Sequence, residues 1–173
     1  MEDGEGPAGV AGCDVDLNQT GFFQQVIGTL ANTLEEVVGL EDAASFVGVV
    51  GGEIGDELSR KYSMALGRRE LDVGTIAAIL VDLKARIGGS FRIESITEDE
   101  ICLVNGHCPF ARQVVGRPSL CMMTTNVFGR IVSRASGYAH VEILEAIATG
   151  HAGCRVRVHL RPRADVDGYE FFA

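Results

Sequence analysis

The spacing of apolar residues changes once along this chain, and that change limits the possible folds more than any other feature. Three segments in the first half, about 22–38, 41–62 and 72–87, place apolar residues at the spacing of a helix face. Asp72 is a suitable N-cap for the third segment, and Gly39 is a suitable C-cap for the first. We therefore expect three helices before any strand.

From residue 91 the period becomes two, which is typical of strands. Residues 91–95 and 101–104 flank a polar turn, and residues 139–148 and 154–160 flank a glycine-containing turn. One further helix is expected at about 118–136. The order ααα–ββ–α–ββ predicts an α+β fold, in which N-terminal helices pack on an antiparallel sheet formed by two hairpins.

Glycine is unusually frequent, at 22 of 173 residues. Gly48, Gly51, Gly52 and Gly55 all fall near one face of the second expected helix. A glycine inside a helix is unfavourable by about 0.5–1 kcal/mol relative to alanine. Close approach of another helix is the expected compensation.

Charge and composition divide the chain into a domain and two tails. Residues 1–18 are acidic and glycine-rich, which predicts a flexible tail. Residues 19–162 form one domain, and residues 163–173 form a C-terminal tail. The formal net charge of −9 argues against nucleic acid as a partner. The chain has no secretory signal and no apolar run of membrane-spanning length, so a cytoplasmic protein with no membrane association is expected.

Three of the five cysteines stand at the ends of predicted elements. Cys108 follows the first hairpin, Cys121 lies near the start of the fourth helix, and Cys154 opens the last strand. A loop, a helix start and a hairpin end could meet there. Thiolates are suitable ligands for an iron–sulfur cluster or for zinc.

The ligand set of such a site is open on spacing alone. A fourth ligand could be Cys102, His107 or His151, or the site could stay open to a small ligand. The alternative is that these thiols are core residues, because cysteine packs as a small hydrophobe. Cys102 lies in an apolar strand and fits the core better, and Cys13 lies in the tail.

These residues also resemble a known family. Three motifs carry the likeness: Asn105-x-x-Cys108-Pro109-Phe110, Cys121 after a proline, and Gly150-x-x-x-Cys154 at the start of the last strand. They are similar to the C-terminal half of vinyl-reductase-like domains, and most similar to the methanogen output domain group. The segment from Phe22 to Gly55 resembles the helical half of the same families. The likeness spans roughly residues 20–162.

The resemblance implies a fold shared with haem-NO-binding sensors and vesicle-tethering subunits, often dimerising through helices. It implies ligand sensing rather than catalysis. The three-cysteine signature is similar to that of iron–sulfur-sensing regulators, so an iron–sulfur cluster on Cys108, Cys121 and Cys154 is expected before zinc or no metal. The four histidines fall in predicted loops and strands, which does not favour haem.

The main hypothesis is therefore a signal-sensing module that binds a small ligand or a cysteine-ligated metal and reports through a homodimer or a signalling partner. One alternative is a structural interaction module, in which the cysteines are core and the glycines permit a helix–helix dimer. A second alternative is a cysteine-dependent hydrolase with Cys108 as nucleophile and His107 or His151 as base. Adjacent Cys and His side chains point apart on an extended chain, which argues against His107 in that role.

Overall fold

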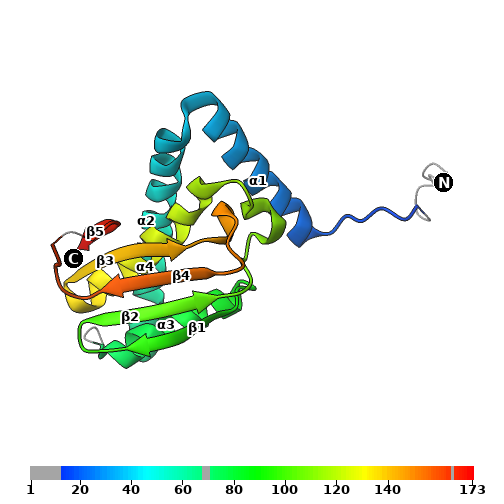
Figure 1. Ribbon diagram of the computed structural model, residues 1–173. Coiled ribbons are helices and arrows are strands. Elements are labelled where there is room, and N and C mark those ends of the chain that lie inside the picture. Colours follow the sequence, from blue (N-terminus) through cyan, green and yellow to red (C-terminus); the bar gives the residue numbers. More distant parts are fainter. Residues whose placement is uncertain (1–12, 68–70, 165) are drawn as a thin grey trace, which may run out of the picture.

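The computed structural model describes residues 13–67, 71–164 and 166–173 of the chain (Figure 1). It begins with three helices, α1 (Gln19–Val38), α2 (Leu40–Leu66) and α3 (Val73–Arg86). The side chain of Asn18 caps α1 by accepting a hydrogen bond from the Gly21 N–H at 2.9 Å. A single residue, Gly39, separates α1 from α2, and its φ of 83° is a conformation that favours glycine. Of the predicted acidic tail, residues 1–12 lie outside the described residues.

The strands form one antiparallel sheet. They are β1 (Phe91–Ile96), β2 (Glu100–Asn105), β3 (Tyr138–Glu145), β4 (Cys154–His159) and β5 (Tyr169–Phe172). Their spatial order is β1-β2-β4-β3-β5, so the two predicted hairpins lie side by side. The α+β prediction is confirmed. The chain also forms a strand that the sequence did not predict, because β5 lies in the stretch expected to be a C-terminal tail and pairs with β3.

The chain between β2 and β3 contains two short 3₁₀ helices, η1 (Ala111–Val114) and η2 (Pro118–Leu120), followed by helix α4 (Cys121–Ser136). In Figure 1, α3 and α4 lie against one face of the sheet. The core between these helices and the sheet includes Ile76 and Leu80 of α3, Phe128 of α4, and Leu103 and Val158 of the sheet.

The glycines of α2 are explained by its contact with α4. A Cβ added at Gly55 would stand 3.1 Å from the Cα of Val127, and one added at Gly51 would stand 3.2 Å from the Cα of Met123. The prediction that these glycines admit a neighbouring helix at short range is therefore confirmed, with α4 of the same chain as that helix.

The larger apolar residues of the first two helices mostly face outward. In α1 only Gly28 and Ala31 are buried, whereas Phe22, Phe23 and Leu30 are at least half exposed. In α2 the sequence pattern placed Phe46 and Val50 on the apolar face with Val47, yet both are exposed. The glycine face packs instead, because backbone-to-backbone approach to α4 needs small residues there.

Candidate functional site

Cys108, Cys121 and Cys154 line one small cavity at the end of the sheet nearest α1. Its volume is about 30 Å³, enough for an occupant of very few heavy atoms. All three are free thiols, and each is partly buried. The remaining wall is mainly apolar and comes from the loop after β2, η1, η2, α4 and the sheet: Phe91, Asn105, Pro109, Phe110, Val114, Leu120, Thr124, Ile143, Ala146, Ala148 and Val156.

Asn105, at the end of β2, shapes the loop that carries Cys108. Its buried Oδ1 accepts hydrogen bonds from the Ser90 N–H, the Ser90 hydroxyl and the His107 N–H, at 3.0–3.1 Å. A single side-chain oxygen thus connects the start of β1 to the turn after β2. The motif Asn-x-x-Cys therefore has a structural reason, because the asparagine fixes the turn that presents the thiol.

Cys154 is placed by a close approach of two backbones. It pairs with Asn105 in the β2–β4 ladder, and a Cβ on the preceding Gly153 would stand 2.7 Å from the Asn105 carbonyl oxygen. Only glycine fits there without displacement. The Sγ of Cys154 accepts a hydrogen bond from the Ile147 N–H at 3.5 Å. Cys121 is the first residue of α4, so η2 determines its position.

A buried lysine beside the cavity is a residue that the sequence reasoning missed. Lys84 of α3 is 4% exposed, and its Nζ donates a hydrogen bond to the Thr124 Oγ1 at 2.8 Å. The same Nζ lies 5.5 Å and 5.3 Å from the ring centroids of Phe91 and Phe128. Thr124 and Phe91 line the cavity. The signal was present in the sequence, since Lys84 continues the inward spacing of Ile76 and Leu80.

Burial controls the ionisation of these groups. Desolvation lowers the pKa of Lys84 from 10.5 to about 8, opposed by the electrostatic influence of Cys108, Cys154 and Cys121. Desolvation raises the pKa of the Cys108 thiol, and it raises that of Cys121 to about 12. At neutral pH the cavity therefore presents neutral thiols at Cys108 and Cys121 beside a cationic Lys84.

The remaining predicted site residues lie elsewhere. Cys102 points away from the cavity and donates a hydrogen bond to the Glu94 Oε2 at 3.1 Å, and Cys13 is exposed. His107 is exposed, and the ring of His151 lies 3.2 Å from the Thr149 hydroxyl. His140 and His159 are buried on the sheet face opposite the helices.

The described side chains do not fit a metal as they stand. Within residues 13–67, 71–164 and 166–173, no three His, Cys, Asp or Glu side chains are grouped so that they could hold a metal ion. For the hydrolase alternative, burial raises the pKa of the Cys108 thiol, whereas a nucleophilic thiol needs a lowered pKa.

The segment 108–120, which supplies five of the lining residues, also holds α1. The Gln24 Nε2 donates to the Pro109 carbonyl oxygen at 2.8 Å, and Glu35 accepts from the Ser119 N–H at 3.1 Å. Between these two contacts, Gly28 lies against Gln113 and Ala31 packs in the same apolar cluster as Val114 and Leu120. One face of α1 is thus fixed to the wall of the cavity, while its other face is exposed and apolar.

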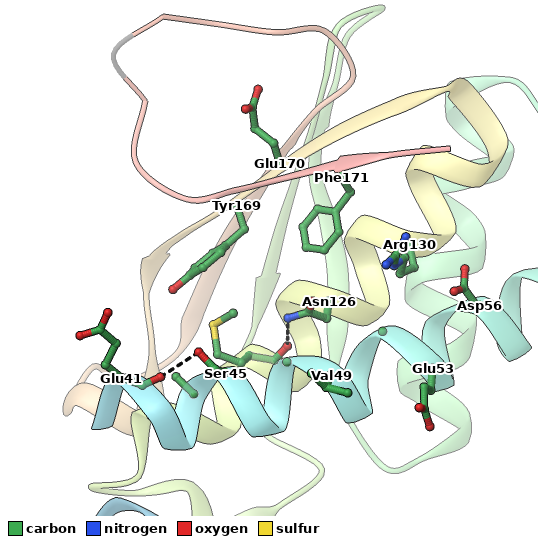
Figure 2. A pocket seen from close by; sticks show the side chains of 14 residues that line it. Glu41, Ser45, Val49, Glu53, Asp56, Asn126, Arg130, Tyr169, Glu170 and Phe171 are labelled. Carbon is green, nitrogen blue, oxygen red and sulfur yellow. Dashed lines mark hydrogen bonds between the residues drawn. The ribbon is translucent and has the colours of Figure 1, made fainter. Parts of the chain in front are cut away.

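A larger and more open groove of about 640 Å³ lies between α2, α4 and β5 (Figure 2). Figure 2 shows Arg130 and Asn126 of α4 facing α2, with Tyr169 and Phe171 of β5 above them. Glu41, Glu53 and Asp56 give its α2 wall a negative charge. The groove contains no thiol, and the Asn126 amide is bonded within α4 to the Met122 carbonyl oxygen. Its chemistry is therefore less distinctive than that of the cysteine cavity.

No helix in the described part of the chain is long and apolar enough to cross a membrane.

Comparison with solved structures identifies the fold. One similar structure is trafficking protein particle complex subunit 3 from Naegleria fowleri, covalently bound to palmitic acid; the TM-score is 0.64 at 14% identity, over 83% of this chain and 95% of that chain. Another is the phenol-responsive sensory domain of the transcription activator PoxR with phenol, with a TM-score of 0.62 at 16% identity, over 84% of this chain and 76% of that chain. The fold is thus one that occurs in a subunit of the trafficking protein particle complex and in a phenol-responsive sensory domain.

The family follows from the sequence itself. The model of the methanogen output domain 1 family matches residues 26–159, and the chain belongs to that family. The resemblance drawn from the cysteine motifs is therefore confirmed. No curated protein matches the chain. The description of the family as an output domain supports a signalling module.

Proposed function

We propose that this domain senses a small ligand in the cavity between Cys108, Cys121 and Cys154, and that it reports occupancy through α1. The observation that carries the proposal is the double role of segment 108–120. It forms much of the cavity wall, and it makes the contacts that hold one face of α1. The two similar structures, which hold phenol and palmitic acid, support a small-molecule role for this fold.

The physical basis of signalling is the small volume of the cavity. An occupant of more than about two heavy atoms has to displace part of the wall, because packed interiors do not yield continuously. Segment 108–120 is the part best able to move. It consists of loop and single 3₁₀ turns, and Ala111 has a φ of 49°, the one positive φ of a non-glycine residue in the described chain. Movement there would re-orient α1.

The output surface in this proposal is the exposed apolar face of α1 and α2, which includes Phe22, Phe23, Leu30 and Phe46. Contiguous exposed apolar surface is typical of a protein interface. A homodimer or a signalling partner on this face stays a prediction.

Chemical modification that places a small group in the cavity tests the proposal. Methyl methanethiosulfonate adds one methylthio group to a thiol, and modification of both Cys108 and Cys121 in a Cys13→Ser background would place about four heavy atoms in the cavity, more than it holds without movement of the wall. We expect faster amide hydrogen exchange in residues 108–120 and in Gln24–Glu35 of α1, with no change in α3. The triple variant Cys108→Ser, Cys121→Ser, Cys154→Ser serves as the control. Exchange confined to the modified residues, with α1 unchanged, would refute the proposal.

A cysteine-ligated iron–sulfur cluster or zinc is a second candidate occupant, favoured by the fact that all three thiols line one cavity. The thiols would have to move closer together and lose their protons to bind it. Visible absorption and elemental analysis of protein prepared without oxygen would decide this. An absorption band with stoichiometric iron supports the cluster, and metal-free protein with bound or exchangeable small ligand excludes it.

A further inference from the structure

We infer that the occupant of the cysteine cavity is a small anion held in the field of Lys84, an inference that rests on the ligand-sensing function proposed above. Lys84 is one of only two lysines in the chain, and it is almost fully buried. The other, Lys61, is exposed and paired with Glu57. A buried cation in a helix that otherwise packs apolar residues requires an explanation, because burial of an isolated charge is strongly unfavourable.

Nothing in the described chain neutralises this charge. Lys84 makes no ion pair with any described carboxylate, and the groups that act on it electrostatically are Cys108, Cys154 and Cys121. Glu35 is near enough to act on Cys121, but its carboxylate accepts the Ser119 N–H. The ammonium has three N–H donors, and the hydrogen bond to Thr124 uses one of them.

The surroundings of Lys84 indicate what kind of anion fits. Its Nζ is hydrogen-bonded to Thr124 and lies over the Phe91 ring, 5.5 Å from the ring centroid, and both residues belong to the wall of the cavity. A negative group in the cavity would therefore be separated from the Lys84 ammonium only by these wall residues. The low polarity of the wall strengthens the attraction between the two charges. The volume of about 30 Å³ has room for about two water-sized groups, so an anion of three or four heavy atoms enters with only a small displacement of the wall. The ligand class is thus a compact monoanion, such as a short carboxylate.

Acetate and acetamide test the inference, because they have nearly the same shape and differ in charge. The full chain would be treated with methyl methanethiosulfonate at constant ionic strength and neutral pH, with each compound as protectant of Cys108, Cys121 and Cys154. We expect acetate to give half-maximal protection at a concentration at least tenfold lower than acetamide. Lys84→Met should abolish that preference, and Lys84→Arg should retain most of it. Lys61→Met is the matched control and should leave it unchanged.

Three outcomes would overturn the inference. Equal protection by the two compounds, or a preference for acetate that persists in Lys84→Met, would show that Lys84 does not select charge. Stoichiometric iron or zinc on the three thiols would show that the occupant is a metal. In each case, a response of α1 to methylthiolation would leave the proposed sensing function standing, whereas the absence of that response would refute the function independently.

Discussion

Gly28 of α1 lies so close to Gln113 of segment 108–120 that a Cβ on Gly28 would stand 2.5 Å from the Gln113 Oε1 and 2.8 Å from its Cβ. This contact joins the wall of the cysteine cavity to the helix that carries the exposed apolar surface. It is also one position at which a substitution should weaken the contact between α1 and segment 108–120.

Gly28→Ala should destabilise the domain by about 1–2 kcal/mol, because the overpacking at Gln113 outweighs the gain in helix propensity. Urea denaturation would measure the change. Gly21→Ala in the same helix is the matched control, since its Cβ would make an ordinary 3.5 Å contact with Asn18. That variant should be neutral or stabilised by about 0.5 kcal/mol. Equal effects of the two substitutions would contradict the close contact.

A second pair of substitutions tests the contact between α2 and α4. A Cβ on Gly55 would stand 2.8 Å from the Arg130 Cβ and 3.1 Å from the Val127 Cα, whereas one on Gly52 would meet only the Arg130 Nε at 3.7 Å. Gly55→Ala should therefore lower the unfolding free energy by about 1–3 kcal/mol. Gly52→Ala, three residues away in the same helix, should leave it unchanged or raise it. Thermal and urea unfolding would both report the difference.

Lys84 should give the domain a distinctive alkaline stability profile. Its folded pKa of about 8 lies below its unfolded value of 10.5, so between these pH values the unfolded chain keeps a proton that the folded chain has lost. The contribution of Lys84 to stability therefore rises with pH across that window. Lys84→Met, which removes the buried charge, should be more stable than the native domain by roughly 1–3 kcal/mol at pH 7. That difference should shrink towards pH 10.5, and a constant difference would contradict the burial of a charged lysine.

His159 should have an effect of the same sign at lower pH, in mild acid. The Nδ1 of His159 lies 3.4 Å from the Glu100 carboxylate, and its Nε2 lies 3.6 Å from the Glu142 carboxylate. The His140 ring is beside it, and the positive charge of Arg163 opposes its protonation. Desolvation lowers the pKa of His159 below its usual 6.5 in spite of the two carboxylates. As pH falls through 6.5, the unfolded chain binds a proton before the folded chain does, so stability falls. His159→Gln should lose less stability between pH 7 and pH 5.5 than the native domain. A steeper loss of stability in the variant would contradict a lowered pKa of His159.

The sequence predicts most of this fold because its helices and hairpins have strong periodic patterns. The convergence of Cys108, Cys121 and Cys154 also follows from their positions at the ends of elements. Strand β5 is different, since it is four residues long and its pairing with β3 depends on tertiary contacts such as Phe171 against Gly129. Local pattern cannot contain that information.

The role of Lys84 shows a second limit. Helical spacing places residue 84 on the inward face of α3, but an isolated lysine in such a position is ordinarily read as the end of the apolar face. Its burial depends on Thr124, forty residues away, and on the rings of Phe91 and Phe128. The exposure of Phe22 and Phe46 could not be predicted from the sequence either, because it depends on which face of each helix the other elements contact.

The most direct measurement of the central claim is the rate at which the cavity thiols react when α1 is disturbed. Coupling between two sites is reciprocal, so a change at Gly28 has to affect the cavity if the cavity affects α1. The rates of iodoacetamide modification at Cys108 and Cys121 would be compared in Gly28→Ala, Gly21→Ala and Gly55→Ala, under conditions where each variant is folded. We expect at least about fivefold faster modification in Gly28→Ala only. Equal rates in Gly28→Ala and Gly21→Ala would contradict it.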